Sequence, residues 1–433
     1  MSDKERINQA LRDAEPALFE SLSQLGRDAY YPPDIPFQTA EARGAEFNAT
    51  IGQITDGEGR VLALPAVAEQ LGSLGERHLS ASLLYSPVEG VPQLRRLWSR
   101  RHRPEGAPAS TLPLVTVGLT EGLSLVADLF CDRETPVVLA SPFWGNYGQI
   151  FGLRRGGRIV ETSVFFDGGF QPEAIIEAVG AQPAGVPVVV LLNFPSNPTG
   201  YSPLPDERAV LVDGLAAAAD NRPLVVVCDD AYAGLVFEAG VPAESLFWSL
   251  AGRHRNLIPV KVDGVTKELV LFGARVGFLT FGCERSGPAS EALESKVKCL
   301  LRASVGSPVA LSQCLVAEAL EAPGLEREVM EVHGTLARRY RRLQQVLQSC
   351  DPDLLRPLPF NSGCFAVVEL PEGLDAEVVR RTLLESHSTG VIAIGSSHLR
   401  FAYCSVREQA IPELVSRVEA CVRTLCAETA AVE

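Results

Sequence analysis

Long apolar runs, an excess of positive charge and internal repeats are all missing from this chain of 433 residues. It has no run of about 18 apolar residues, and charged side chains occur throughout residues 1–25, so we expect neither a membrane span nor a signal peptide. The net charge of -14 and the pI near 5.1 argue against nucleic acid or an anionic membrane as a partner.

Cysteine pairs with C-x-x-C spacing are also absent, although the chain has ten cysteines between Cys131 and Cys426. Several, including Cys228, Cys299 and Cys404, lie in apolar runs. We therefore expect buried free thiols in a reducing cytoplasm rather than a disulfide framework or a zinc site. The six histidines show no ligand spacing either, so no metal is predicted.

What is present is enough apolar sequence for a large core. With 46% hydrophobic and 21% charged residues, the chain is expected to form two domains rather than one. Strand candidates alternate with helical stretches in the middle of the chain, which predicts a doubly wound, mainly parallel α/β sheet. The candidates lie near residues 113–117, 136–140, 158–162, 187–192, 224–229, 257–262, 269–273 and 276–281.

The two ends of the chain have different patterns. Residues 5–26 place leucines and isoleucine on one face of an expected amphipathic helix. Residues 323–349 form a long charged helical stretch that would bridge the domains. After it, strands at 364–370 and 399–406 and helices at 376–384 and 408–426 predict a smaller α+β unit.

Lys267 is the candidate for covalent chemistry in this chain. It lies among Val265, Leu269, Val270 and Phe272, which indicates partly apolar surroundings. Burial lowers the pKa of a lysine and frees its lone pair for covalent chemistry. Alternatively, Lys267 is a surface residue of a hairpin whose stem lies on the sheet.

Three upstream segments place polar groups directly after apolar strand candidates, where open α/β sheets bind ligands. The segments are the Asn-Pro-Thr-Gly turn at 197–200, the acid pair and phenol at 229–232, and the Gly-Leu-Thr helix start at 118–120. A helix start with free amides can bind an anion. Taken singly, each segment has another explanation. The acid at 229 can be a helix N-cap, and the Gly-Leu-Thr turn can connect a strand to a helix without binding a ligand.

Together these segments form one ordered pattern. Lys267, Arg275 eight residues later, the Asp-x-Ala-Tyr of 229–232, the Asn-Pro-Thr-Gly turn and the Gly-Leu-Thr start resemble the fold-type I pyridoxal-phosphate enzymes of the class I/II aminotransferase family. The resemblance extends from about residue 45 to about residue 425. It implies a large cofactor-binding domain at 56–322, a bridging helix with a small domain at 323–433, and an N-terminal helix and arm at 1–55 that packs with the small domain.

The resemblance also implies roles around the cofactor, pyridoxal 5'-phosphate. Lys267 would hold it as a Schiff base and move the substrate proton, while Asp229 would keep its pyridine nitrogen protonated. The hydrogen-bond donors to its phenolic oxygen would be Asn197 and Tyr232. The phosphate ligands would be Gly118, Leu119, Thr120 and Arg275.

Four further residues are assigned by the same resemblance. Trp144 would stack on the pyridine ring, and Tyr85 would reach the phosphate of a neighbouring subunit, which requires a homodimer. Arg400 would bind the substrate α-carboxylate, with Gly52 and Asn197 nearby. Alternatively, Trp144 covers the sheet edge, Tyr85 is an ordinary turn residue and Arg400 pairs with an acid of the protein.

Two positions leave questions open. Gly264 stands three residues before the lysine, where many family members carry a serine that contacts the phosphate, and Thr266 offers the nearest hydroxyl. Arg302 stands where the aspartate-specific branch binds a side-chain carboxylate, but the residues after it fit that branch only loosely. The amino acid and the oxo acid are therefore not predicted.

The resemblance implies a cytoplasmic aminotransferase that moves an amino group between an amino acid and a 2-oxo acid by a ping-pong mechanism. The alternative is another pyridoxal-phosphate reaction on the same scaffold, such as a β-elimination lyase or a cyclising synthase. A sensor fused to a DNA-binding module is not expected, because the segment before Phe47 is too short and too acidic.

Overall fold

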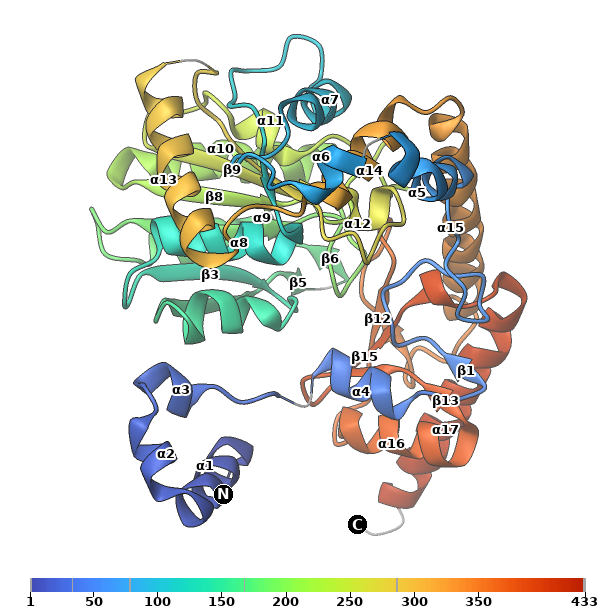
Figure 1. Ribbon diagram of the computed structural model, residues 1–433. Helices are drawn as coiled ribbons and strands as arrows, with labels where there is room; N and C mark the ends of the chain where they lie inside the picture. The colour runs from blue at the N-terminus through green and yellow to red at the C-terminus, as the bar shows by residue number, and fades with distance from the viewer. Residues whose placement is uncertain (1, 33, 78, 167, 286, 431–433) are drawn as a thin grey trace.

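A seven-stranded mixed sheet forms the centre of the larger part of the protein (Figure 1). The computed structural model describes residues 2–32, 34–77, 79–166, 168–285 and 287–430. All neighbouring strands of the sheet run parallel except β10, which is antiparallel to both of its neighbours. In spatial order the strands are β2 (Leu114–Thr116), β10 (Gly277–Phe281), β9 (Leu257–Gly264), β8 (Leu224–Asp229), β7 (Val188–Asn193), β3 (Pro136–Ser141) and β4 (Arg158–Ser163).

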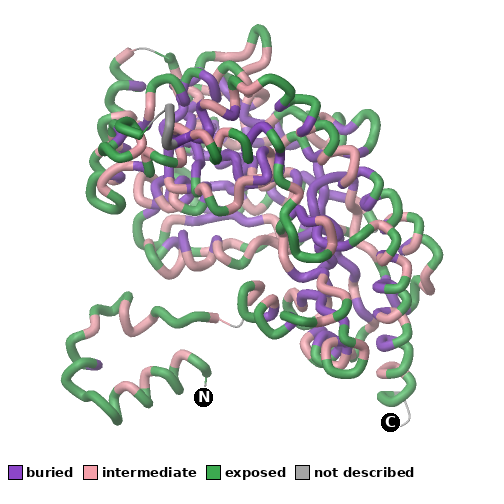
Figure 2. Tube along the Cα trace, turned by 45° about the vertical axis from the view of Figure 1, so that its right-hand side comes forward, coloured by how far each residue is buried: buried purple, intermediate pink, exposed green. Residues whose placement is uncertain are grey.

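The central strands of the sheet are buried on both faces, as their continuous valine and leucine runs predict. Successive residues of β7 belong to different cores: Val189 and Leu191 pack on one side, and Val188 and Val190 on the other. Figure 2 shows this burial concentrated along the central strands. The expected doubly wound, mainly parallel sheet is confirmed. The helices in this part are α8 (Gly118–Phe130), α9 (Pro172–Gly180), α10 (Pro205–Ala218), α11 (Leu246–Leu250) and α13 (Pro288–Ser304), with a π-helix at Gly148–Leu153.

The smaller part contains an antiparallel four-stranded sheet, in agreement with the expected α+β unit. Its strands are, in spatial order, β11 (Arg356–Pro357), β12 (Ala366–Glu369), β15 (His398–Phe401) and β14 (Ile392–Ile394). The helices α16 (Ala376–His387) and α17 (Ile411–Ala430) and the long α15 (Leu325–Leu347) pack with it. Their shared core also includes residues of the large sheet, such as Phe278, so the two parts pack together.

The segment before the large sheet reaches the smaller part. The short strand β1 (Phe47–Asn48) pairs in parallel with β13 (Thr389–Gly390), and Gln38 of α4 (Ile35–Glu41) exchanges hydrogen bonds with the Ala393 backbone. The next helices are α5 (Pro65–Arg77), α6 (Leu79–Leu83) and α7 (Pro92–His102); α14 (Ala310–Glu321) packs against all three. Shorter elements are β5 (Phe165–Phe166), β6 (Gly169–Phe170), α12 (Val265–Glu268) and 3-10 turns at Ala219–Asn221, Tyr403–Ser405 and Glu408–Ala410.

The single amphipathic helix expected over residues 5–26 is instead three short helices. These are α1 (Asp3–Ala14), α2 (Pro16–Ser21) and α3 (Gln24–Asp28), and Figure 1 shows them apart from both sheets. Pro16 begins α2, because a proline lacks the N–H that would continue α1. The hydroxyl of Ser23 accepts a hydrogen bond from Gly26 N and so starts α3 as a separate helix.

Two other expectations were wrong. Residues 269–273 are not a strand: they form the turn after α12, where Val270 has a φ of 53°, a conformation that a strand does not allow. Cys299 is exposed on α13 rather than buried, whereas Cys228 and Cys404 are buried free thiols as expected. None of the helices in the described part of the chain combines the length and the hydropathy of a membrane span.

Candidate active site

A cavity of about 220 Å³ lies where the carboxyl ends of β7 and β8 face the smaller sheet. Every site residue expected from the sequence lines it except Gly118 and Tyr85. It continues, through Trp144, Asn197 and Ile35, into a wider cleft of about 1110 Å³. The lining residues that the sequence predicted are Gly52, Leu119, Thr120, Trp144, Asn197, Asp229, Tyr232, Lys267, Arg275 and Arg400.

Lys267 enters the cavity from α12, the four-residue helix that directly follows β9. Its Nζ lies 4.8 Å from the centroid of the Tyr232 ring. Burial lowers the pKa of Lys267, although the charge of Asp229 opposes that shift. The next residue, Glu268, pairs with Arg101 and His102, which anchors α12 to α7. Lys267 is therefore a partly buried amine that lines a cavity from a fixed helix, not the surface lysine of the alternative interpretation.

Asp229 is the last residue of β8 and only 3% exposed. The Tyr147 hydroxyl donates to its Oδ2 at 2.6 Å, and the Ala231 amide donates to its Oδ1 at 3.1 Å. Burial raises the pKa of Asp229, while the bond from Tyr147 and the charge of Lys267 lower it. A buried carboxylate held in this way is suited to pair with a positively charged group of a ligand.

Tyr147 was missed in the sequence analysis. Tyr147 lies three residues after Trp144 and directly before the π-helix. The two aromatic rings are 5.3 Å apart between their centroids. Burial raises the pKa of Tyr147 far above its ordinary value, so the phenol stays a neutral donor. Its spacing of one helical turn after Trp144, the expected stacking residue, could have identified Tyr147 from the sequence.

The Asn-Pro-Thr-Gly turn is tied to β8 and to the smaller sheet by hydrogen bonds. The Asn197 amide donates to Asn193 Oδ1 at 2.7 Å, and Asn193 Nδ2 donates to the Asp229 carbonyl at 2.8 Å. The Oδ1 of Asn197 accepts from Arg400 Nη1 at 3.0 Å. Asn193, which the sequence analysis did not select, thus positions Asn197 relative to Asp229.

Arg400 is only 1% exposed on β15, and no carboxylate lies within ion-pair distance of it in the part of the chain that the structure describes. Its Nη2 donates to the Thr50 carbonyl at 2.6 Å, and its guanidinium lies 4.3 Å from the Phe365 ring centroid. Its Nε has no partner among these residues. Burial lowers the pKa of Arg400 to about 10, so it is still charged at neutral pH. Among the described residues Arg400 forms no ion pair with a protein acid, contrary to the alternative interpretation, so its charge can pair with an anionic group of a ligand.

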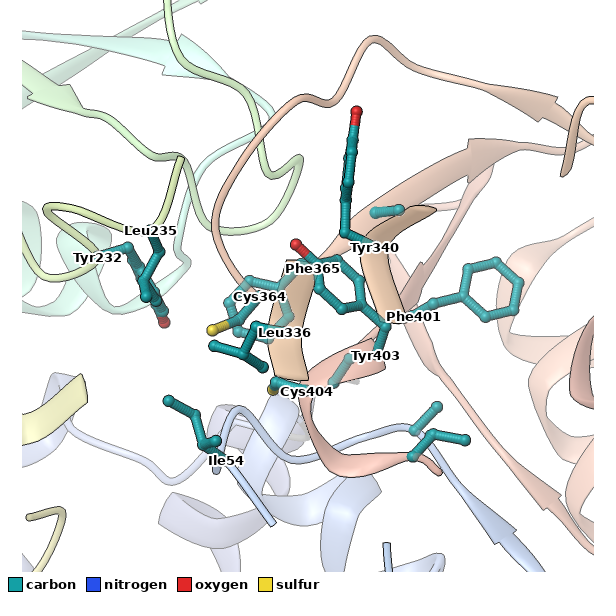
Figure 3. Packing of buried hydrophobic residues seen from close by; sticks show 14 of the residues in the cluster. Ile54, Tyr232, Leu235, Leu336, Tyr340, Cys364, Phe365, Phe401, Tyr403 and Cys404 are labelled. Carbon is teal, nitrogen blue, oxygen red and sulfur yellow. The ribbon is translucent and has the colours of Figure 1, made fainter. Parts of the chain in front are cut away.

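Aromatic packing joins the two sheets beside these residues. Tyr232 follows β8 and Phe365 precedes β12, and their rings meet edge to face at 5.5 Å between centroids. Figure 3 shows Tyr232 and Leu235 approaching Phe365 and Cys364 from the opposite part. Gly52 lies against the same ring, because a Cβ there would come within 2.7 Å of Phe365 Cζ. The cavity is therefore built from both parts of the protein.

The start of α8 forms a cradle for an anion. Gly118 has a φ of 76°, and a Cβ at this position would lie 2.4 Å from Arg275 Nη2, so only glycine lets the guanidinium approach the helix start. Leu119 and Thr120 follow in the first turn, where backbone N–H groups are free of helical partners. The helix dipole and Arg275 both favour a negative charge here.

Three other residues lie elsewhere. Tyr85 is 95% exposed just after α6, and Arg302 is exposed near the end of α13, so neither lines the cavity of its own chain. Asp230 lies away from the cavity beside Lys261, whose Nζ is 3.9 Å from its Oδ2. Burial raises the pKa of Asp230 to about 7. Of the two neighbouring acids, only Asp229 lines the cavity.

Comparisons with known proteins agree with this geometry. A model of the family "Aminotransferase class I and II" matches residues 47–418. A 2-aminoadipate transaminase from Thermus thermophilus is 30% identical over 84% of this chain and 87% of its own length. An aspartate/prephenate aminotransferase from Thermus thermophilus is 27% identical over 75% of this chain and 80% of its own length.

Solved structures share the fold at lower identity. An aminotransferase from Anaerococcus prevotii superposes with a TM-score of 0.80 at 22% identity, covering 92% of this chain and 98% of that one. The α-aminoadipate aminotransferase LysN from Thermus thermophilus, solved with N-(5'-phosphopyridoxyl)-L-leucine, has a TM-score of 0.77 at 24% identity, covering 95% and 99%.

Proposed function

Since this chain belongs to the class I and II aminotransferase family, we propose that Lys267, Asp229 and Arg400 move an amino group between an amino acid and a 2-oxo acid in the cavity between the two sheets. The protein is a pyridoxal-phosphate-dependent aminotransferase. The observation that carries the proposed site is the buried guanidinium of Arg400, which has no carboxylate partner among the described residues and lines the same cavity as the partly buried Lys267.

The residues present fit pyridoxal phosphate. The amine of Lys267 matches the aldehyde, the carboxylate of Asp229 matches the ring nitrogen, and Arg275 with the start of α8 matches the phosphate. Asn197 and Tyr232 would donate to the phenolic oxygen, and Trp144 would cover the ring. When bound, the cofactor supplies an electron-withdrawing ring that stabilises charge at the substrate Cα and stores the amino group between half-reactions.

Each protein group then has one task. Arg400 binds the substrate α-carboxylate with its planar fork and so fixes the direction of the bond from Cα to hydrogen. Lys267 Nζ removes that proton; its lowered pKa favours the neutral, basic form of the amine. Phe365 lies beside the guanidinium and Gly52 lies against the Phe365 ring; both line the cavity, restrict the substrate on that side and exclude water.

We further propose a cytoplasmic homodimer with shared active sites. Tyr85 is exposed together with Leu83 and Leu84, and such an apolar patch is typical of a subunit interface. The phenol of Tyr85 would reach the phosphate site of the partner subunit. Ten unpaired cysteines are typical of a reducing compartment. Residues 1–55, 56–322 and 323–433 would act as arm, large domain and small domain.

The substrate side chain is a separate question. The cationic residues that line the cavity are Lys267, Arg275 and Arg400, and the tasks above use all three. A second substrate carboxylate would need a cation from elsewhere, and Arg302 of a partner subunit is the candidate that the sequence offers. The names of the relatives make 2-aminoadipate and aspartate the first donors to test.

A single-turnover experiment tests this proposal. The purified protein is loaded with pyridoxal phosphate and mixed with one amino acid at a time, including 2-aminoadipate, aspartate, leucine and phenylalanine. We expect at least one of them to shift the cofactor absorbance to that of the pyridoxamine form, and a 2-oxo acid to reverse it. The Lys267→Ala variant should show neither change. Uptake of no cofactor, or release of ammonia without the pyridoxamine form, would contradict the proposal.

A further inference from the structure

Gly264, at the end of β9, has no room for a side chain. Its φ of 167° is extended backbone that any residue adopts, so conformation is not the reason. A Cβ would lie 2.7 Å from the Val276 carbonyl oxygen, 2.8 Å from Leu119 Cδ1 and 2.9 Å from Gly277 Cα. Two of these contacts are backbone atoms on the side of β10, which pairs with β9 here and cannot move away cheaply. A hydroxyl for the anion cradle therefore cannot come from position 264.

Thr266 lies two residues further, in the first turn of α12, and is 5% exposed. Its Oγ1 is buried without a hydrogen-bond partner among the described residues. The residue lines the same cavity as Leu119, Thr120 and Arg275, which form the cradle at the start of α8. Buried hydroxyls nearly always have a partner in folded proteins, so an unpartnered one at the wall of a cavity is available to a ligand atom.

We propose that the Thr266 hydroxyl donates a hydrogen bond to the phosphate of the bound cofactor and replaces the side chain that position 264 excludes. The inference rests on the proposed function, because it needs the phosphate at the start of α8. A hydroxyl suits this place because it adds a donor beside Arg275 without adding charge. Because Thr266 directly precedes Lys267, the same short helix would hold both the phosphate and the aldehyde carbon of the cofactor.

Two ligands separate a phosphate contact from a general loss of structure. Cofactor-free protein is titrated with pyridoxal 5'-phosphate and with pyridoxal, which keeps the aldehyde and the ring but lacks the phosphate. For Thr266→Val we expect the Kd of pyridoxal phosphate to rise about 10- to 150-fold, the range for one hydrogen bond to a charged group. The Kd of pyridoxal should not change. Thr266→Ser should restore tight binding, and Thr266→Ala should behave like Thr266→Val if the valine variant does not fold.

Thr39→Val is the matched control. Thr39 lies on α4 and is partly buried; its hydroxyl also lacks a partner among the residues that the structure describes, but the residue does not line the cavity. Its replacement should leave the Kd of both ligands unchanged. The ³¹P chemical shift of the bound cofactor gives a second measurement, because loss of a donor to the phosphate should move this signal in Thr266→Val and not in Thr39→Val.

The outcomes are distinct. If the unaltered protein binds no pyridoxal phosphate, the proposed function fails and this inference fails with it. If the unaltered protein binds the cofactor and Thr266→Val binds it equally well, or if Thr266→Val weakens pyridoxal by the same factor, only the role of Thr266 is overturned. Gly264→Ser combined with Thr266→Val should not recover binding. Full recovery in that double variant would show that position 264 accepts a side chain.

Discussion

Replacing Arg400 tests the substrate site most directly. In Arg400→Met the buried guanidinium is lost while a side chain of comparable length fills its space beside Phe365. The arginine donates to the Thr50 carbonyl and to Asn197 Oδ1, and both acceptors are neutral. A buried guanidinium is stabilised by a negative charge, and the substrate carboxylate can supply that charge. The Arg400→Met variant removes the group that binds this carboxylate.

The size of the effect follows from the two N–H donors of a forked guanidinium–carboxylate contact. Hydrogen bonds to charged groups contribute about 1.5–3 kcal/mol each, so two contribute about 3–6 kcal/mol. At about 1.36 kcal/mol per tenfold change, kcat/KM for amino acids should fall by about 10² to 10⁴. Uptake of pyridoxal phosphate should persist, because its anchors are Lys267, Asp229 and Arg275.

The assay compares the half-reaction of an α-amino acid with that of a primary amine that has the same side chain but no carboxylate. The variant should be much slower than the unaltered protein with the amino acid and equal to it with the amine. Arg380→Gln is the matched control: Arg380 is also buried, but it pairs with Glu41 and Glu377, and none of the three lines the cavity. It should lower the melting temperature and leave kcat/KM unchanged. Equal losses with the amino acid and the amine in Arg400→Met would refute the carboxylate role.

Two more predictions concern the groups that hold the cofactor. Because burial lowers the pKa of Lys267 below its ordinary 10.5, the unfolded state binds more protons and the buried charge destabilises the folded protein below that pKa. Cofactor-free Lys267→Met should therefore be the more stable protein in urea at pH 7, with an advantage that shrinks as the pH rises towards 10.5; an advantage that grows would contradict this. Tyr147→Phe removes a donor to Asp229 and should raise the pKa of that carboxyl. In the pH–rate profile the acidic limb should move to higher pH, and an unmoved limb would show that Asp229 does not depend on Tyr147.

Local sequence determined the sheet and much of the cavity wall. The valine and leucine runs of β7 and β8 must be covered on both faces, which leaves only a layered α/β arrangement. Strand ends in such a sheet meet at one edge, so Asn197 and Asp229 could be placed together from their spacing alone. The expected strand at 269–273 failed because apolar composition does not reveal the positive φ of Val270.

Tertiary structure alone decided which polar groups lack partners. No spacing rule shows that, among the described residues, Arg400 has no acid beside it and the Thr266 hydroxyl has no partner, or that Tyr147 donates to Asp229. Each of these facts depends on segments far apart in the sequence. The same holds for Gly264, whose missing side chain is explained by the strand packed against it. A sequence specifies which groups are available and which strand ends carry them. The unmet charges and hydrogen bonds that a ligand must satisfy arise only when the chain excludes water from them.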